Sequence, residues 1–154
     1  MITLSELEKI QSKWGSGIVK IGSIKSDRKA CEKATLEMLN ELYAFELGDV
    51  LFKPTKTEKK QFRLKIEGAK SYFIGGNPKF GEDKGFAINP WQSVAFENAS
   101  VILNETHALA MGNYFFTDLS GIMVKVEYTF GCIRGNNGNL KINLHHSSLP
   151  FKKD

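Results

Sequence analysis

The sequence predicts an α+β fold, in which N-terminal helices pack on a curved antiparallel β-sheet. The first part of the chain repeats its apolar residues at helical spacing behind two capping signals, whereas the chain from Pro90 onward has the pattern of β-strands. Helices followed by a run of antiparallel strands are typical of the α+β class. With 154 residues, the chain fits one domain over residues 1–154 and can bury a substantial core.

The first helix is expected to begin after Thr3, because Thr3 and Glu6 can form a capping box. Apolar residues then recur at helical spacing, at Leu4, Leu7, Ile10 and Trp14. We expect Gly15-Ser16-Gly17 to weaken or end this helix, since glycine costs helix stability.

A second helix is expected after Asp27, which is a favourable N-cap residue. One apolar stripe runs along it, made of Cys31, Ala34, Met38, Leu42 and Phe45. Gly48 is well placed to end this helix. A short third helix is expected over residues 67–73, stopped by Gly75-Gly76.

Between these helices, residues 50–55 are expected to form a short strand. Pro54 marks an edge or an end of it, because proline has no N–H to give to a ladder. Residues 77–89 are rich in glycine, proline and charge, so we expect a surface loop, with a lid over a site as the alternative.

Four strands are expected over residues 91–102, 107–117, 124–132 and 140–149. The second of them is apolar on both faces, so it should be central and covered on both sides. This predicts a homodimer formed through the outer face of the sheet. Residues 135–138, Gly-Asn-Asn-Gly, predict a hairpin before the last strand.

Composition excludes several classes of protein. The net charge of +4 is mild and its basic residues are scattered, which argues against a nucleic-acid partner. No apolar run is long enough to span a membrane, and the N-terminus has no cleavable apolar segment. Two cysteines are too few for a disulfide framework. Together these features predict a cytoplasmic protein.

The last strand ends in polar residues that form a candidate site. Strict alternation places His146 and Ser148 on the face of Leu140, Ile142 and Leu144, and His145 and Ser147 on the opposite face. An apolar face that ends in an imidazole and a hydroxyl predicts a small polar pocket at the open end of the sheet. The alternative is a terminal strand that becomes polar as it approaches solvent.

Several pieces of sequence, in order, carry a resemblance to a known family. They are residues 50–55 (Val-Leu-Phe-Lys-Pro-Thr), 67–76 (Glu-Gly-Ala-Lys-Ser-Tyr-Phe-Ile-Gly-Gly), 85–87 with 90–91, 110–113 (Ala-Met-Gly-Asn) and 145–150 (His-His-Ser-Ser-Leu-Pro). From about Phe45 to its end, the chain resembles the iota class of carbonic anhydrases, a branch of the NTF2-like (cystatin-like) fold. Residues 52–54 and the last strand also resemble the association domain of calcium/calmodulin-dependent kinase II. The chain departs from the family at Phe130, near which the family usually has tryptophan.

The resemblance implies an NTF2-like cone that hydrates CO2 to bicarbonate in a small pocket, without a metal or other cofactor. It places the family's threonine on Thr55 and its tyrosine on Tyr72. The family's His-x-Ser pair falls on His146 and Ser148, or on His145 and Ser147, and alternation favours the first pair. Hydroxyl groups can both donate and accept hydrogen bonds, and an imidazole can take a proton near neutral pH.

More than one function remains open from sequence. A catalytic zinc is disfavoured, because the chain has three histidines and the adjacent His145 and His146 should face opposite ways. A non-catalytic association module and a pocket for a small organic ligand both compete with a carbonic anhydrase. The organic-ligand pocket would need a buried Asp or Glu as a base, and the predicted inner face offers none. The fold alone does not decide among these functions.

Overall fold

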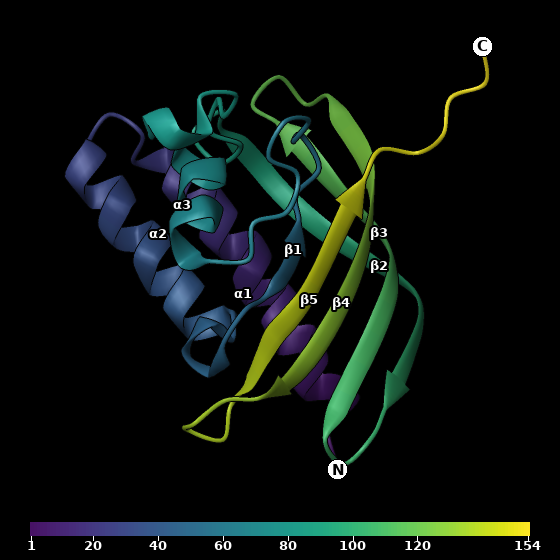
Figure 1. The fold of residues 1–154 in the computed structure, drawn as a ribbon. Helices are drawn as coiled ribbons and strands as arrows, with labels where there is room; N and C mark the ends of the chain where they lie inside the picture. The colour runs from purple at the N-terminus through teal and green to yellow at the C-terminus, as the bar shows by residue number, and fades with distance from the viewer.

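The computed structural model describes all residues from Met1 to Asp154. Its three α-helices are α1 (Leu4–Ser23), α2 (Arg28–Leu42) and α3 (Ile66–Ile74), with short 3-10 turns at Phe45–Leu47 and Pro78–Phe80. The strands are β1 (Leu51–Lys53), β2 (Trp91–Leu103), β3 (His107–Asp118), β4 (Met123–Arg134) and β5 (Leu140–Ser148). Figure 1 shows the helices gathered on one side of a curved sheet, which confirms the predicted α+β architecture.

The sheet has the strand order β1-β5-β4-β3-β2. Strands β2 to β5 form the predicted antiparallel meander. β1, however, runs parallel to β5, with Leu51 opposite Leu144 and Lys53 opposite His146, so the sheet is mixed rather than wholly antiparallel. A parallel pair needs a long connection instead of a hairpin, and α3 and the meander supply it here. β1 lies at an edge and ends before Pro54, as predicted.

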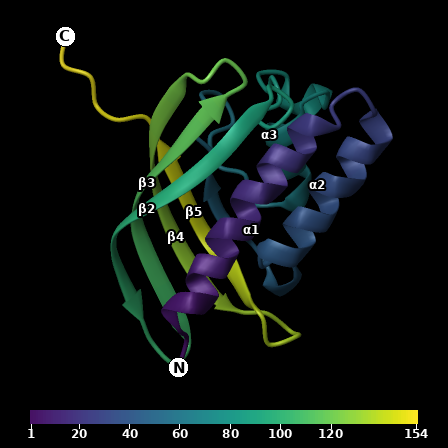
Figure 2. The same cartoon turned by 180° about the vertical axis from the view of Figure 1, so that it is seen from behind.

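Helix α1 lies across the concave face of the sheet, as Figure 2 shows. The predicted capping box between Thr3 and Glu6 starts it. Gly15-Ser16-Gly17 does not end the helix, which was one of the two predicted outcomes, because α1 continues to Ser23. None of the helices is both long and apolar enough to cross a bilayer.

The two glycines inside α1 allow close packing on both sides of the helix. A Cβ atom at Gly15 would lie 3.2 Å from Cβ of Val94 in β2, and one at Gly17 would lie 2.6 Å from Sδ of Met38 in α2. Each glycine costs the helix about 1 kcal/mol relative to alanine. The contacts that this close approach allows offset that cost, and no local sequence pattern reports them.

Helix α2 is capped by Asp27, whose side chain accepts a hydrogen bond from the Ala30 N–H at 3.1 Å. It ends at Leu42, before the predicted end at Gly48. Tyr43 then takes an extended conformation and forms an isolated parallel bridge with Ile142 of β5. This early end matters because it directs the Tyr43 side chain into the core, where it is 1% exposed.

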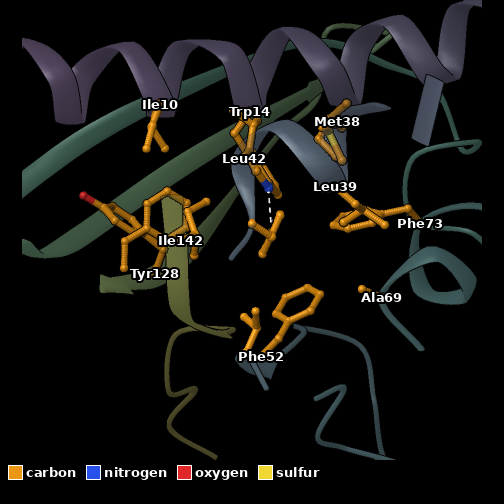
Figure 3. Close-up of a cluster of buried hydrophobic side chains, with 14 of the residues drawn as sticks. Ile10, Trp14, Met38, Leu39, Leu42, Phe52, Ala69, Phe73, Tyr128 and Ile142 are labelled. Carbon is orange, nitrogen blue, oxygen red and sulfur yellow. Dashed lines mark hydrogen bonds between the residues drawn. The ribbon is translucent and has the colours of Figure 1, made fainter. Parts of the chain in front are cut away.

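The core lies between the sheet and the helices and is rich in aromatic rings. Figure 3 shows Trp14 of α1, Phe73 of α3 and Phe52 of β1 among side chains that converge from different elements. Ring pairs such as Trp14–Phe73 and Phe52–Phe73, with centroids 6.3 and 6.0 Å apart, connect these elements. The outer face of β3 is different. Its Met111 is 59% exposed, so the prediction that this strand is covered on both faces is wrong for the single chain.

Strand β5 contains an extra residue that changes which side chains face the core. Gly131 of β4 lies opposite Leu144, but Cys132 lies opposite Ile142, so Asn143 has no partner of its own. This is a β-bulge, and it reverses the alternation of the strand beyond it. Ile142 before the bulge and His145 after it are therefore both buried.

A second bulge, between β2 and β3, gives a direct test of the backbone geometry. A Cβ atom at Gly112 would lie 2.1 Å from the Glu97 carbonyl oxygen and 2.7 Å from the Ala99 nitrogen. We expect Gly112→Ala to lower the free energy of unfolding by about 1–3 kcal/mol, because backbone atoms must move. Gly81→Ala is the matched control, since its nearest atom is the Pro78 carbonyl oxygen at 3.9 Å, and it should change stability by less than about 0.5 kcal/mol. Urea unfolding measures both values, and equal stabilities would contradict the close approach.

Candidate functional site

A set of hydrogen-bonded polar side chains lies inside the cone, around a small cavity. The residues come from four separate elements: Thr55 follows β1, Tyr72 lies in α3, Tyr114 in β3, and His145 and Ser147 in β5. The cavity measures about 10 Å³, close to the space that one water molecule needs. Only a molecule of a few atoms fits among these groups without movement of side chains.

The prediction that His146 and Ser148 line this cavity is wrong. His145 and Ser147 line it instead, and each of these two is 1% exposed. His146 is exposed, and Ser148 lies on the outer face, where its hydroxyl donates to a Glu127 carboxylate oxygen at 3.3 Å. The bulge at Asn143 is the cause, because strict alternation from Leu140 does not continue through it.

The other two predicted residues, Thr55 and Tyr72, both line the cavity. Thr55 Oγ1 lies 2.5 Å from Ser147 Oγ, a contact that ties the end of β1 to β5. The Tyr72 hydroxyl accepts a hydrogen bond from the Lys56 backbone N–H at 3.2 Å. Burial raises the pKa of Tyr72 to about 12, so this hydroxyl keeps its proton at neutral pH.

Three further polar side chains belong to the network, and none of them was identified as a site residue from the sequence. Tyr114 Oη lies 2.5 Å from Ser147 Oγ and 3.2 Å from His145 Nε2. Tyr43 Oη lies 2.8 Å from His145 Nδ1, and the Trp14 indole N–H donates to the same Tyr43 oxygen at 2.9 Å. The only sequence signal was general: a tyrosine or tryptophan in a core usually needs a partner for its polar atom.

The imidazole of His145 is enclosed by aromatic rings. Phe52 stacks on it with centroids 4.8 Å apart, and Phe130 meets it edge to face at 4.7 Å. Phe130, the position at which the sequence was expected to depart from the family, thus forms a wall of the histidine site. No carboxylate takes part in the network, so the polar groups around the cavity are hydroxyls and one imidazole.

Burial, together with a smaller effect of the neighbouring His146, lowers the pKa of His145 to about 3. The ring is therefore neutral near pH 7, unlike an imidazole with an ordinary pKa. Burial also raises the pKa of Tyr43 and of Tyr114 well above the usual range. The interior of the site is thus a dry set of neutral dipoles.

A larger hollow of about 700 Å³ lies outside the cavity and shares Tyr72 and Phe86 with it. Charged side chains line its rim, among them Lys56, Lys84 and Asp118. We refer to this hollow as the mouth, since Tyr72 borders both spaces.

The loop of residues 77–89, for which a lid was the alternative to a plain loop, is anchored to the segment after β1. The Asp83 carboxylate forms a fully buried ion pair with Arg63 at 2.7 Å and accepts a hydrogen bond from Ser71 at 2.6 Å. The Glu82 carboxylate accepts hydrogen bonds from the backbone N–H groups of residues 58–60. These contacts hold the rim of the mouth in place.

No group of three or more His, Cys, Asp or Glu side chains lies close enough together to hold a metal ion. His107 is exposed, and its Nε2 lies 2.8 Å from Asn104 Nδ2 near the turn before β3.

Comparisons with known proteins identify the fold and the family. The chain resembles a calcium/calmodulin-dependent protein kinase II association domain from Xanthomonas campestris, with a TM-score of 0.66 and 21% identity over 99% of this chain and 91% of that one. It also resembles a protein of the NTF2-like family from Streptomyces avermitilis, with a TM-score of 0.55 and 12% identity over 97% of this chain and 96% of that one. At these identities the likeness shows the fold alone, and it confirms the predicted NTF2-like cone.

Nearer relatives show more than the fold. The crystal structure of an iota-carbonic anhydrase from a cyanobacterium, complexed with bicarbonate, has a TM-score of 0.94 and 34% identity over 99% of this chain and 94% of that one. A metal-independent carbonic anhydrase from Nostoc sp. is 37% identical over an alignment of 155 positions, which covers 99% of this chain and 76% of the relative. The family model described as metal-independent carbonic anhydrase matches residues 5–149. The chain therefore belongs to the family of metal-independent carbonic anhydrases.

Proposed function

We propose that this protein catalyses the reversible hydration of CO2 to bicarbonate in the cavity between Thr55, Tyr72 and Ser147. The observation that carries this proposal is the convergence of four hydroxyl groups, those of these three residues and of Tyr114, on a space large enough for only a few atoms. The bicarbonate complex of the cyanobacterial iota-carbonic anhydrase, which is 34% identical to this chain, supports the same substrate.

The hydroxyl groups are suited to hold bicarbonate and the charge that develops as it forms. The oxygen of Tyr72 already accepts a backbone N–H, which leaves its own proton for a ligand. Thr55 and Ser147 are held 2.5 Å apart, so they act from one position. Fixed donors in a dry site stabilise a developing anion without having to reorganise.

His145 contributes as a neutral ring that keeps the hydroxyl groups in position. Its low pKa means that it does not store the proton released from water. That proton leaves on the mouth side, past Tyr72, which borders both the cavity and the outer hollow. None of these groups lowers the pKa of water as a bound zinc ion does, so we propose a catalyst of modest rate.

The alternative of a site for a small organic ligand is less well supported. Such pockets measure roughly 300–1,000 Å³, whereas the hydroxyl-lined cavity measures about 10 Å³. The cavity also has no carboxylate that could act as a base. The alternative of an association module concerns a different surface and is compatible with catalysis.

We also propose that the protein is a homodimer formed through the outer face of the sheet. Three apolar side chains of β2 and β3 are exposed there: Ile102, Leu109 and Met111. Apolar side chains of neighbouring strands leave a continuous surface that a second copy can cover. The sequence predicted cover on both faces of β3, and a dimer would supply the missing layer.

The first prediction concerns the two serines of β5. Ser147→Ala and Tyr72→Phe should each lower kcat for CO2 hydration by about a hundredfold, because each removes a donor to the developing anion. Ser148→Ala is the matched control, since this serine lies on the outer face, and its rate should be unchanged. Stopped-flow assays on purified proteins, with and without a chelator, measure the rates.

Three results would contradict this proposal. One is full activity in both Ser147→Ala and Tyr72→Phe. Another is a loss in Ser148→Ala as large as that in Ser147→Ala. The third is a stoichiometric metal that the chelator removes together with the activity.

The second prediction concerns pH and stability. His145 has a pKa of about 3 when folded and about 6.5 when unfolded. The unfolded chain therefore binds more protons between these values, and stability that is fully present above pH 6.5 is lost as the pH falls toward 3. This group alone should remove about 2 kcal/mol between pH 7 and pH 5.

Urea unfolding at these two pH values measures the effect. The loss should be smaller by about that amount in His145→Gln, which cannot take up the proton. His107→Gln is the control, because His107 is exposed and does not act on the pKa of His145, and it should keep the wild-type dependence on pH. An identical pH dependence in wild type and His145→Gln would show that the ring is not held neutral.

The third prediction concerns assembly. Met111→Lys places a charge in the centre of the proposed interface, and burial of that charge is costly, so the variant should be monomeric. Phe62→Lys, at an apolar side chain that is 65% exposed in the segment after β1, should leave the dimer intact. Light scattering at micromolar concentration distinguishes the two masses, and a monomeric wild type would contradict the proposal.

A further inference from the structure

The hydrogen bonds around His145 form one continuous chain, and its direction is set at the inner end. The Trp14 indole N–H lies 2.9 Å from Tyr43 Oη, and an indole N–H can only donate. The Tyr43 hydroxyl is buried and has one other partner, His145 Nδ1 at 2.8 Å.

Tyr43 has one proton to donate, and Trp14 cannot accept it. If His145 Nδ1 carried a hydrogen, Tyr43 would accept from both neighbours, and its own proton would have no partner. A buried donor left unpaired costs roughly 1–3 kcal/mol. The arrangement that satisfies every group has Tyr43 donating to Nδ1, which leaves the ring hydrogen on Nε2.

The same reasoning continues outward from the ring. His145 Nε2–H donates to Tyr114 Oη at 3.2 Å, so the Tyr114 proton goes to Ser147 Oγ at 2.5 Å. Ser147 Oγ and Thr55 Oγ1, also 2.5 Å apart, share one hydrogen bond in which either can donate. The three hydroxyl groups of Tyr114, Ser147 and Thr55 thus have three protons for the two bonds between them, and the remaining proton is available to the cavity, next to that of Tyr72.

We propose that Trp14 and Tyr43 are positioning residues that fix His145 in its Nε2–H tautomer and thereby turn the hydroxyl protons of this chain toward the cavity. The catalytic meaning of this inference depends on the proposed function. A cavity lined by hydroxyl protons binds an anion such as bicarbonate. If the hydrogen bonds ran in the opposite direction, a lone pair of Thr55 would face the cavity instead.

The Trp14 indole N–H, at the inner end of this series of hydrogen bonds, has a second consequence. Trp14 cannot accept a proton, so a proton that enters at Thr55 has no exit at the inner end. This series of hydrogen bonds can orient and polarise the hydroxyl groups, but it cannot carry protons away from the site. Release of the proton through the mouth, past Tyr72, follows from this.

Nitrogen NMR of protein labelled with ¹⁵N in its histidine rings tests the inference. The chain has three histidines, and His145→Gln assigns the signal of interest. At pH 7 the wild type should show an unprotonated Nδ1 and a protonated Nε2 for His145. In Tyr43→Phe, Nδ1 has no partner in either tautomer, so the preference for Nε2–H that Tyr43 imposes is lost and the two forms should mix. In that variant kcat should fall about 10- to 100-fold, the loss typical when the partner that orients a ligating histidine is removed.

Tyr128→Phe is the matched control. Its hydroxyl is also buried and hydrogen-bonded, but its partners are Gln11 and Asn98, which do not belong to the series of hydrogen bonds around His145. The variant should lose stability as any such tyrosine does while keeping the His145 tautomer and kcat. Trp14→Phe provides a second test that keeps the Tyr43 hydroxyl, and it too should populate both tautomers.

Two results would overturn the inference. The first is an Nδ1–H tautomer or a doubly protonated His145 in the wild type at pH 7. The second is a Tyr43→Phe protein whose tautomer and kcat both match the wild type. The NMR measurement needs no activity, so a wild type that fails to hydrate CO2 would contradict the proposed function and leave the tautomer to be decided separately.

Discussion

The buried imidazole of His145 constrains the structure around it, because a neutral ring in a dry core needs a partner for each nitrogen. Tyr43 and Tyr114 are these partners, and they come from opposite parts of the chain. Tyr43 reaches the ring because α2 ends at Leu42 and the next residue is extended against β5. The position of the helical layer relative to the sheet is therefore tied to the same contacts that orient the cavity.

The aromatic walls and the hydrogen bonds act together. Phe52 and Phe130 exclude water from the ring, and this exclusion both lowers the pKa of His145 and strengthens the hydrogen bonds between its neighbours. The buried ion pair between Arg63 and Asp83 has a separate role at the rim, where it joins the segment after β1 to the loop after α3. The groups that line the cavity are thus neutral, and the Asp83 carboxylate of this pair borders the outer hollow.

Local sequence patterns predicted the parts of the fold that depend on local chemistry. Caps at Thr3 and Asp27 and the four strands after Pro90 follow from short-range preferences, and the structure confirms them. The passage of α1 through Gly15 and Gly17 was not predictable in this way, because contacts with β2 and α2 outweigh the cost of glycine. The parallel pairing of β1 likewise depends on a partner almost a hundred residues away in the chain.

The candidate site was predicted in part, for a related reason. Thr55 and Tyr72 were found through a family resemblance, and they line the cavity. The choice of His146 and Ser148 failed at one residue, since strict alternation cannot detect that Asn143 bulges where β5 meets Gly131. Trp14 was identified only as an apolar residue, because its role as a hydrogen-bond donor depends on where Tyr43 lies.

The central claim is that bicarbonate binds on the inner side of β5, among the hydroxyl groups that His145 holds in place. A crystal structure of this protein with bicarbonate tests it most directly. The account predicts the anion within hydrogen-bond distance of Thr55, Tyr72 or Ser147, inside the aromatic wall. An anion bound instead at His146 and Ser148 on the outer face of the sheet, with the inner cavity unchanged, would contradict it.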